Sequence, residues 1–299
     1  MAQVEDDRPA TIEDVARTAG VSRAAVSKVI RNAYGVSPAM SAKVKAAIEE
    51  LSYRPRVPAR AMRGSSYTLG IEIPDFSNQF LTRVLRGATE ALAGSGYQLL
   101  IAPAEASSHQ GYRALEALVD HQVSDKYDTV AGDDEKGAMD ALNHLFDLGH
   151  NRILHLTRDG AAILPQMKDP HGVRLQTYLR VMEESGRSQF SRVVTAGEGE
   201  SYAREVMLEP LRTQDHPTAI FAGHDELAIG ALHAIPEVGV DISVVGYDNV
   251  PIAAHPAISL TSVDQQGERM GARAVELLLE RIQGRTDAVD EIFTPSLQV

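Results

Sequence analysis

The sequence predicts a two-part protein, an all-α helix-turn-helix headpiece followed by a large doubly wound α/β region. Three observations support this. Short amphipathic helices with capping residues follow one another between Thr11 and Leu51. From Tyr67 onward, apolar strand-like runs alternate with helical patterns, as in parallel sheets covered on both faces. The charge also changes sign between the two parts.

The charge separates the chain more clearly than any other compositional feature. The 299 residues carry a formal net charge of −12, which by itself argues against a nucleic-acid binder. Residues 8–64, however, hold 11 Lys and Arg against four acidic residues, a balance of +7. Residues 65–299 hold 18 basic and 34 acidic residues, a balance of −16. A basic head on an acidic body is the asymmetry expected when only the head meets phosphates.

The first two predicted helices have the size and surface of a DNA reader. Thr11 followed by two carboxylates is a favourable helix start, and Ala19-Gly20 is a favourable helix end. Ser22 caps the second helix, whose outer face carries Arg23, Ala24, Ser27, Lys28 and Arg31. Small side chains allow close approach to base edges, and Arg or Lys can reach guanine. By this pattern alone, an ordinary helical hairpin is an equal alternative.

A third helix and a short basic tether follow. Ser37-Pro38 begins the third helix with a cap and a proline at its first position. Residues 54–64 are rich in Pro and Arg, and Pro58 favours a helix that runs to Arg63 and ends at Gly64. Six residues are too few for a stable isolated helix, which needs about 12 to 15. The alternative interpretation is a plain Pro/Arg-rich linker.

The large region shows strands at 69–73, 97–102, 153–156, 218–222 and 242–247, with helices after Ser77 and at 133–148 and 267–283. In open parallel sheets, ligands bind beyond the carboxyl ends of the strands. That rule selects Asp75 and Phe80, His224 and Asp225, and Asp248, each following a predicted strand. A strand-end Asp is as often a helix cap as a ligand contact.

Residues 11–64 resemble the headpiece and hinge of the LacI/GalR (lactose-repressor) family of bacterial transcription regulators. The resemblance implies base-reading roles for Arg23, Ala24 and Lys28, and an apolar contact for Ile12. It implies backbone contacts for Ser22, Arg31, Ser37 and Tyr53. Met62 takes the place of an apolar wedge, usually leucine, at a central base step. Arg56, Arg60 and Arg63 lie beside it as expected phosphate contacts.

The large region resembles the periplasmic-binding-protein-like core of the same family, two lobes around a cleft. The resemblance adds Arg174 to the effector site, with Arg174 and Asp248 as its leading pair. A carboxylate, a guanidinium and an aromatic ring suit a sugar or related polyol. We expect a headpiece at 8–53, a hinge at 54–66 and an effector-binding and dimerisation domain at 67–299. Within that domain, we expect lobe one at about 67–150 and 264–284, and lobe two at about 151–263 and 285–299.

Several functions are disfavoured by the sequence. It has no cysteine, no dinucleotide fingerprint, no nucleophile elbow and no metal-ligand spacing, so we expect no cofactor, no metal and no enzyme activity. No apolar run is long enough for a membrane span, and no export signal opens the chain, so a cytoplasmic location is expected.

Two places look short for the expected fold, near 125–126 and 235–241, since a βαβ unit takes about 30 residues. We therefore suspect segments missing from the chain there, a hypothesis that an intact mass equal to 32.3 kDa would refute. 

The sequence predicts a sequence-specific DNA-binding transcriptional regulator, typically a repressor, whose operator affinity responds to a small-molecule effector. We expect a homodimer or dimer of dimers on a pseudo-palindromic duplex. Two alternatives remain, a solute-binding protein of a transport system and a doubly wound α/β enzyme.

Overall fold

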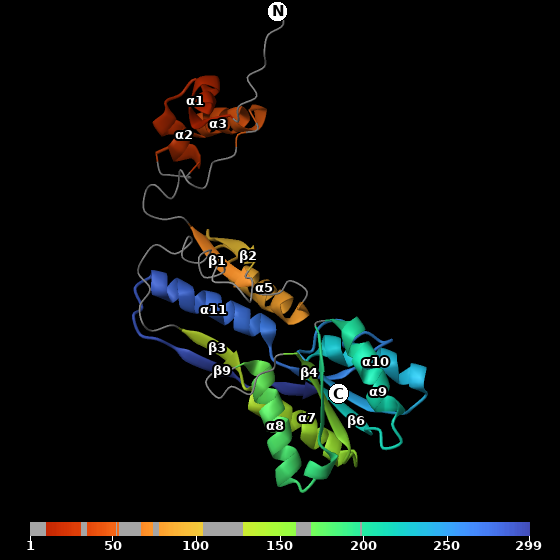
Figure 1. The fold of residues 1–299 in the computed structure, drawn as a ribbon. Helices are drawn as coiled ribbons and strands as arrows, with labels where there is room; N and C mark the ends of the chain where they lie inside the picture. The colour runs from red at the N-terminus through yellow and green to blue at the C-terminus, as the bar shows by residue number, and fades with distance from the viewer. Residues whose placement is uncertain are drawn as a thin grey trace, which may run out of the picture. The chain divides into compact units, whose positions relative to one another are not determined.

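A computed structural model describes residues 10–30, 35–51, 53, 67–73, 78–103, 128–159, 169–197 and 199–299. The chain divides into two compact units, Met1–Thr68 and Leu69–Val299 (Figure 1). Of the site residues that the sequence predicts, Arg31, Arg56, Arg60, Met62, Arg63 and Asp75 lie outside the described residues.

The first unit contains three helices, α1 (Ile12–Ala19), α2 (Arg23–Ile30) and α3 (Pro38–Glu50). Their ends follow the predicted capping: Thr11 and Asp14 form a reciprocal capping box, and Gly20 closes α1 in the left-handed conformation at φ 64°. Val15, Val26 and Val44, one from each helix, are fully buried against one another. The three-helix headpiece is therefore confirmed.

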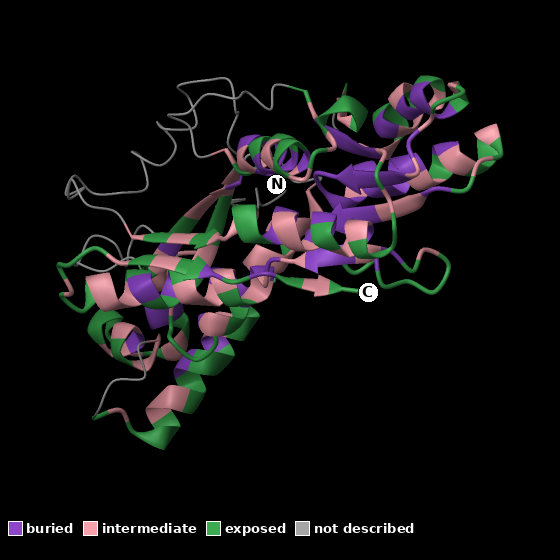
Figure 2. Cartoon of the chain, turned by 90° about the horizontal axis from the view of Figure 1, so that it is seen from below, coloured by how far each residue is buried: buried purple, intermediate pink, exposed green. Residues whose placement is uncertain are grey.

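The second unit is built on a six-stranded sheet with the strand order β10-β8-β7-β6-β4-β5. The strands are β4 (Ile153–Arg158), β5 (Arg192–Ala196), β6 (Ala219–Ala222), β7 (Ser243–Tyr247), β8 (Thr261–Asp264) and β10 (Ser296–Gln298). All described neighbours pair in parallel except β10, which runs antiparallel to β8. The central strands are buried along their length, as the purple arrows in Figure 2 show.

Helices cover both faces of this sheet. On one face α7 (Asp134–Asp147) and α8 (Pro170–Glu184) pack on Ile153 and Phe221. On the other face α9 (Glu200–Arg212) and α10 (Asp225–Val238) pack on Leu154 and Ile220. A 3-10 turn, Ser188–Phe190, precedes β5. Adjacent strand residues thus serve opposite cores, which is the doubly wound arrangement the sequence predicts.

A smaller lobe holds the remaining elements. β1 (Thr68–Ile73) pairs with β2 (Gln98–Pro103), and β3 (Thr129–Gly132) pairs in parallel with β9 (Asp290–Phe293). Helices α5 (Gln79–Ala91) and α11 (Gly267–Ile282) lie against each other (Figure 1). They approach closely because glycines face the neighbouring backbone: a Cβ on Gly87 would lie 1.8 Å from the Glu268 carbonyl oxygen, and one on Gly271 would lie 1.9 Å from that of Val84.

The packing corrects two of the expected lobe boundaries. Helix α7 was expected in lobe one, but Ala138, Leu142 and Leu145 are buried on the six-stranded sheet of lobe two. Strand β9 was expected in lobe two, but it pairs with β3 in lobe one. The reason is that the chain passes between lobes at ordinary connections that follow strands, and in sequence these look the same as connections within one lobe.

The two regions that look short differ in outcome. At 235–241 the structure is continuous: α10 runs through Pro236 to Val238, Gly239 ends it at φ 78°, and β7 pairs directly with β6. This is a complete βαβ unit that lacks no strand, which counts against an omission there. Residues 125–126 lie outside the described residues, and that omission stays a prediction. In its favour, β1–β2 and β3–β9 are described as separate two-stranded sheets, and Leu100, Ile101 and Ile292 are 43–69% exposed.

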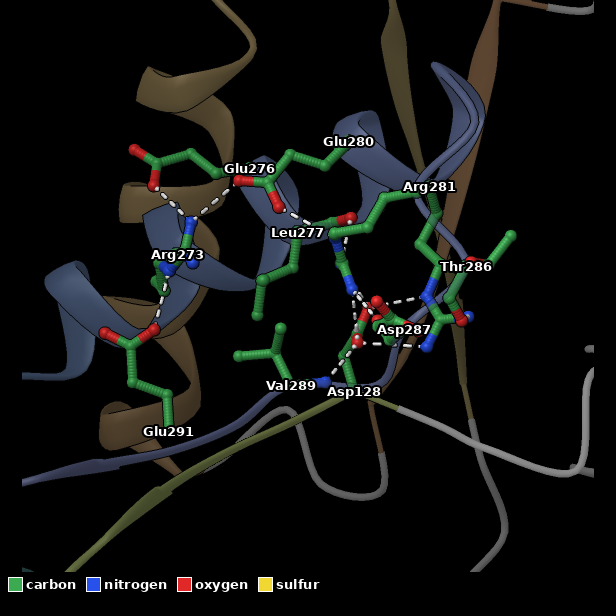
Figure 3. Close-up of polar contacts among 11 residues, drawn as sticks. Asp128, Arg273, Glu276, Leu277, Glu280, Arg281, Thr286, Asp287, Val289 and Glu291 are labelled. Atoms are coloured by element: carbon green, nitrogen blue, oxygen red, sulfur yellow. Dashed lines mark hydrogen bonds and ion pairs between the residues drawn. The ribbon is translucent and has the colours of Figure 1, made fainter.

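In the smaller lobe, ionic contacts link β3, α11 and β9 near their ends. The Asp128 carboxylate accepts hydrogen bonds from Arg281, Arg285 and the Val289 amide (Figure 3). These arginines hold the pKa of Asp128 well below its usual range. The contacts tie the start of β3 to the end of α11 and to the chain entering β9.

Candidate functional site

The exposed side of α2 carries the predicted base-reading residues. Ser22, Arg23, Ala24 and Lys28 are all exposed, while Val26 faces the core. Ser22 Oγ also accepts from the Ala25 amide at 3.2 Å, which caps α2. The helix therefore presents two cations and a short side chain on one side, as direct readout requires.

Arg23 has an intramolecular partner that the sequence analysis missed. Its Nη1 lies 3.1 Å from Glu13 Oε1 of α1, and both side chains are more than 60% exposed. An exposed pair of this kind contributes little to stability and exchanges readily with water. A phosphate or base edge can thus replace Glu13 without exposing a buried charge.

Ile12, Ser37 and Tyr53 are the other predicted contact residues that the structure describes in the headpiece. Ile12 and Tyr53 are half-buried and pack on the three-helix core. Ser37 is exposed, and its hydroxyl accepts from the Met40 amide at 3.2 Å, which caps α3. Ser37 therefore has a structural role in addition to the backbone contact that the resemblance implies.

In the second unit, Arg174 lies at the centre of a cluster of buried polar side chains at the carboxyl end of the six-stranded sheet. The cluster also contains Asp134, Tyr247 and Asp248. Arg174 lies in the first turns of α8 and is 3% exposed. Its Nε and Nη2 contact Asp134 Oδ1 at 2.8 Å, and its Nη1 donates to the Gly223 carbonyl at 2.6 Å. Its guanidinium carbon lies 3.7 Å from the centre of the Tyr247 ring. Burial opposes the charge, but the carboxylate of Asp134 keeps the pKa of Arg174 above its usual value.

Asp248 follows β7 at the same sheet edge. Its side chain is 5% exposed and accepts from Gln265 Nε2. Burial raises the pKa of Asp248 to about 8, against the opposing charge of Arg174. The backbone there is unusual, with φ 104° at Asp248 and 47° at Asn249. With a pKa of about 8, the carboxyl group of Asp248 is largely protonated at neutral pH. It can then both donate and accept hydrogen bonds, which suits a ligand with hydroxyl groups.

His224 is the N-cap residue of α10 after β6, and Asp225 is the first residue of that helix, as the sequence predicts, but the two differ in their contacts. His224 is 4% exposed and meets the ring of His171 edge-on, with 5.3 Å between centroids. Asp225 is fully buried and accepts from the Val250 amide at 2.8 Å and from Ser262 Oγ at 2.6 Å. Burial raises the pKa of Asp225 to about 7. Its contacts join the start of α10 to the loop after β7 and to strand β8.

Phe80 lies in the first turn of α5, in the smaller lobe. It is half-buried, and its ring packs against Gly267 at the start of α11. Beside it, the Gln79 amide donates to Glu226 Oε1 at 3.3 Å, which links α5 to the helix that carries Asp225.

Sequence reasoning missed two polar groups next to Gly223. Thr157, near the end of β4, is fully buried, and its Oγ1 has no hydrogen-bond partner among the described residues; the same holds for His171 Nδ1. Both lie against Gly223, since a Cβ there would be 3.2 Å from His171 Nδ1 and 3.5 Å from Thr157 Oγ1. Burial lowers the pKa of His171, so its imidazole is neutral. The strand-end rule could have found Thr157; nothing local marks His171.

Within the described residues, no group of His, Asp and Glu side chains has the arrangement of a metal site, and no helix is both long and apolar enough to cross a bilayer.

A basic three-helix reader joined to a two-lobed α/β core with a polar sheet edge defines the class of ligand-responsive DNA-binding regulators. Comparison with known proteins agrees: residues 11–56 match the family described as bacterial regulatory proteins, lacI family, and residues 142–299 match the periplasmic binding protein-like domain. The chain belongs to the lacI family of bacterial transcription regulators.

Curated relatives match over nearly the whole chain. The ribose operon repressor of Escherichia coli K12 is 31% identical over 317 residues, covering 91% of this chain and 93% of the relative. GalR of the same organism is 30% identical and covers 96% and 94%. PurR of Photobacterium profundum is 28% identical and covers 92% and 93%. These relatives are transcriptional regulators, not enzymes.

Solved structures show the same fold. The lac repressor dimer bound to operator and the anti-inducer ONPF superposes with a TM-score of 0.78 at 24% identity, covering 98% of both chains. The complex of the regulator CelR with cellobiose has a TM-score of 0.66 at 26% identity and covers 97% of this chain and 98% of that chain.

Proposed function

We propose that this chain is a transcriptional repressor that binds a pseudo-palindromic operator as a homodimer and responds to a neutral sugar or related polyol. The observation that carries the proposal is the cluster of buried polar side chains around Arg174, Asp134 and Asp248 at the carboxyl end of a parallel sheet, on a chain whose headpiece presents an exposed basic recognition helix. One part of the molecule offers contacts to DNA and the other offers contacts to a small ligand.

The chemistry of the site favours an uncharged polyhydroxylated ligand. Its arginine is already neutralised by Asp134, so among the described residues Arg174 offers an anionic ligand no unpaired positive charge. Asp248 and the neutral His171 and Thr157 supply donors and acceptors of the kind that hydroxyl groups use. The ribose operon repressor among the relatives and the cellobiose complex among the solved structures make ribose and cellobiose the first compounds to test.

The proposed action on DNA combines direct readout with a ligand-dependent tether. Arg23 and Lys28 would read base edges, with two recognition helices about 34 Å apart on the duplex. The hinge residues Arg56, Arg60 and Met62 would order against a second copy and the minor groove. A ligand that changes how the lobes close would change the spacing of the two hinges.

DNA binding is tested by measuring the affinity for random duplex DNA between 50 and 200 mM salt, followed by selection of an operator from a randomised duplex library. If about six phosphates are neutralised, affinity falls roughly a thousandfold over this range. Deletion of residues 1–64 should abolish binding. Salt-independent binding, or binding that survives the deletion, contradicts the proposal and favours a solute-binding protein.

The effector is sought in a thermal-shift panel of ribose, cellobiose, other sugars, polyols, nucleosides and purines. A ligand at 100 times its Kd stabilises the folded protein by about 2.7 kcal/mol. A hit must also change the affinity for the selected operator. If only phosphorylated or other charged compounds bind, the neutral-polyol assignment is wrong.

We also propose a cytoplasmic location for this protein, because its proposed partner is DNA.

A further inference from the structure

The backbone that carries Asp248 adopts a conformation that side chains disfavour. Asp248 and Asn249 are consecutive, neither is glycine, and both have positive φ, at 104° and 47°. Residues in this region of backbone space persist only where their surroundings hold them. The contacts that hold this turn therefore decide where the Asp248 carboxyl group points.

The amide and carbonyl sides of the turn are held from different parts of the protein. The Asp248 amide donates to the Val263 carbonyl at 2.8 Å, and the Asn249 amide donates to Ser262 Oγ at 3.0 Å, both within the larger lobe. The carbonyls of Asp248 and Asn249 accept from one atom, Arg83 Nη1, at 2.7 and 2.8 Å. Arg83 lies on α5 of the smaller lobe, 165 residues away in sequence.

Arg83 is itself held rigidly. Its Nε lies 2.9 Å from both carboxylate oxygens of Glu268 on α11, and its Nη1 also donates to Asp264 Oδ1 at 3.1 Å. The side chain is 11% exposed. The close contact of α5 with α11 at Gly87 also holds α5, the helix that carries Arg83, in place. Few positions of the guanidinium satisfy all five acceptor oxygens at once, so a shift of the Asp248 turn is transmitted to α5.

We propose that Arg83 is a positioning residue that holds the Asp248–Asn249 turn in its left-handed conformation and couples the effector site to α5. The inference rests on the proposed function where it treats Asp248 as an effector contact. Helix α5 follows β1, the first strand after the hinge. Among the described residues, Arg83 thus links the Asp248–Asn249 turn directly to the helix that follows β1.

The experiment compares Arg83→Gln and Arg83→Lys with Arg86→Gln as the matched control. Arg86 lies on the same helix, is 55% exposed and reaches Glu268 only at 4.0 Å. The first readout needs no ligand: amide hydrogen exchange at residues 248–250 in the full-length protein. We expect exchange at least tenfold faster in Arg83→Gln, partly rescued in Arg83→Lys, and unchanged in Arg86→Gln. Wild-type exchange in Arg83→Gln overturns the proposal.

The second readout uses ribose and cellobiose as probes. For whichever binds the wild type, Arg83→Gln should raise Kd at least tenfold and reduce the ligand-induced change in operator affinity, whereas Arg86→Gln should match wild type. Unchanged Kd and unchanged operator response in Arg83→Gln overturn the coupling. If neither probe binds wild type, the sugar assignment fails, while hydrogen exchange still decides the role of Arg83. Should Arg83→Gln not fold, Glu268→Gln weakens the same anchor, and wild-type exchange in it overturns the proposal.

Discussion

Arg174 and Tyr247 face each other across the edge of the six-stranded sheet, with the guanidinium carbon 3.7 Å from the ring centre. The contact joins the start of α8 to the end of β7, and Asp248 is the next residue in the chain. A cation over an aromatic ring in a desolvated site contributes about 2 kcal/mol. This pair holds the guanidinium edge-on to Asp134 and thereby shapes the candidate effector site.

Replacement of Arg174 by Gln should abolish the response to the effector and destabilise the protein. It leaves the carboxylate of Asp134 without its cation, and breaking a buried ion pair typically costs about 3 to 5 kcal/mol. Urea unfolding measures the stability, and operator affinity with and without ligand measures the response. Arg180→Gln, an exposed pair on the same helix, is the control and should change stability by less than about 1 kcal/mol. A retained response would remove Arg174 from the site.

Asp248→Asn should flatten the pH dependence of stability. The pKa of Asp248 is raised from 3.8 to about 8 in the folded protein, so the folded state binds the proton more tightly than the unfolded state. Its contribution is present in full below about pH 4 and is lost as pH rises toward 8, by up to about 1.4 kcal/mol per pH unit. Urea unfolding at pH 5, 6, 7 and 8 measures both slopes. Equal slopes in wild type and variant would contradict the assignment.

Gly87→Ala should destabilise the smaller lobe by about 3 kcal/mol. Its Cβ would lie 1.8 Å from the Glu268 carbonyl oxygen, so α5 and α11 must separate. Overpacking of this kind typically costs about 1 to 3 kcal/mol, with larger values where backbone blocks the space. Thr89→Ala, at an exposed position on the same helix, is the comparison, and thermal unfolding is the measurement. A variant as stable as wild type would show that the helices do not approach so closely.

Asp128→Asn should cost about 2 kcal/mol, because Asp128 accepts charge-assisted hydrogen bonds from both Arg281 and Arg285 (Figure 3). The more exposed Glu276, which pairs with Arg273 in the same view, offers an internal comparison. Glu276→Gln should change the free energy of unfolding by less than about 0.5 kcal/mol. Comparable losses in the two variants would mean that burial does not separate these contacts.

Glu13→Gln and Arg23→Ala should act in opposite directions on DNA binding. Removing Glu13 releases Arg23 from its exposed ion pair and should raise operator affinity. Removing Arg23 should cost about 1 to 3 kcal/mol at one base pair and relax the preference there. Competition between operator variants measures both effects, with Lys45→Gln on exposed α3 as the control. Loss of affinity without change of preference would make Arg23 a phosphate contact.

The residues that sequence reasoning found have local signatures. Thr11, Gly20 and Ser37 mark helix ends because their backbone and side-chain preferences act within four residues. His224, Asp225 and Asp248 were found because carboxyl ends of parallel strands share one sheet edge. The structure distinguishes Asp225 from the other two, because the Asp225 carboxylate already accepts hydrogen bonds from the Val250 amide and the Ser262 hydroxyl.

By itself, the sequence determined the three-helix headpiece, the doubly wound class and the position of His224, Asp225 and Asp248 at the carboxyl end of the strands, because periodicity, capping and charge are local properties of the chain. Only the tertiary structure decided that α7 belongs to the larger lobe, that β9 pairs with β3, and that Arg83 holds the turn of Asp248. Those contacts join residues far apart in sequence, and their energies depend on which surfaces become buried together. No pattern within a single segment encodes that choice.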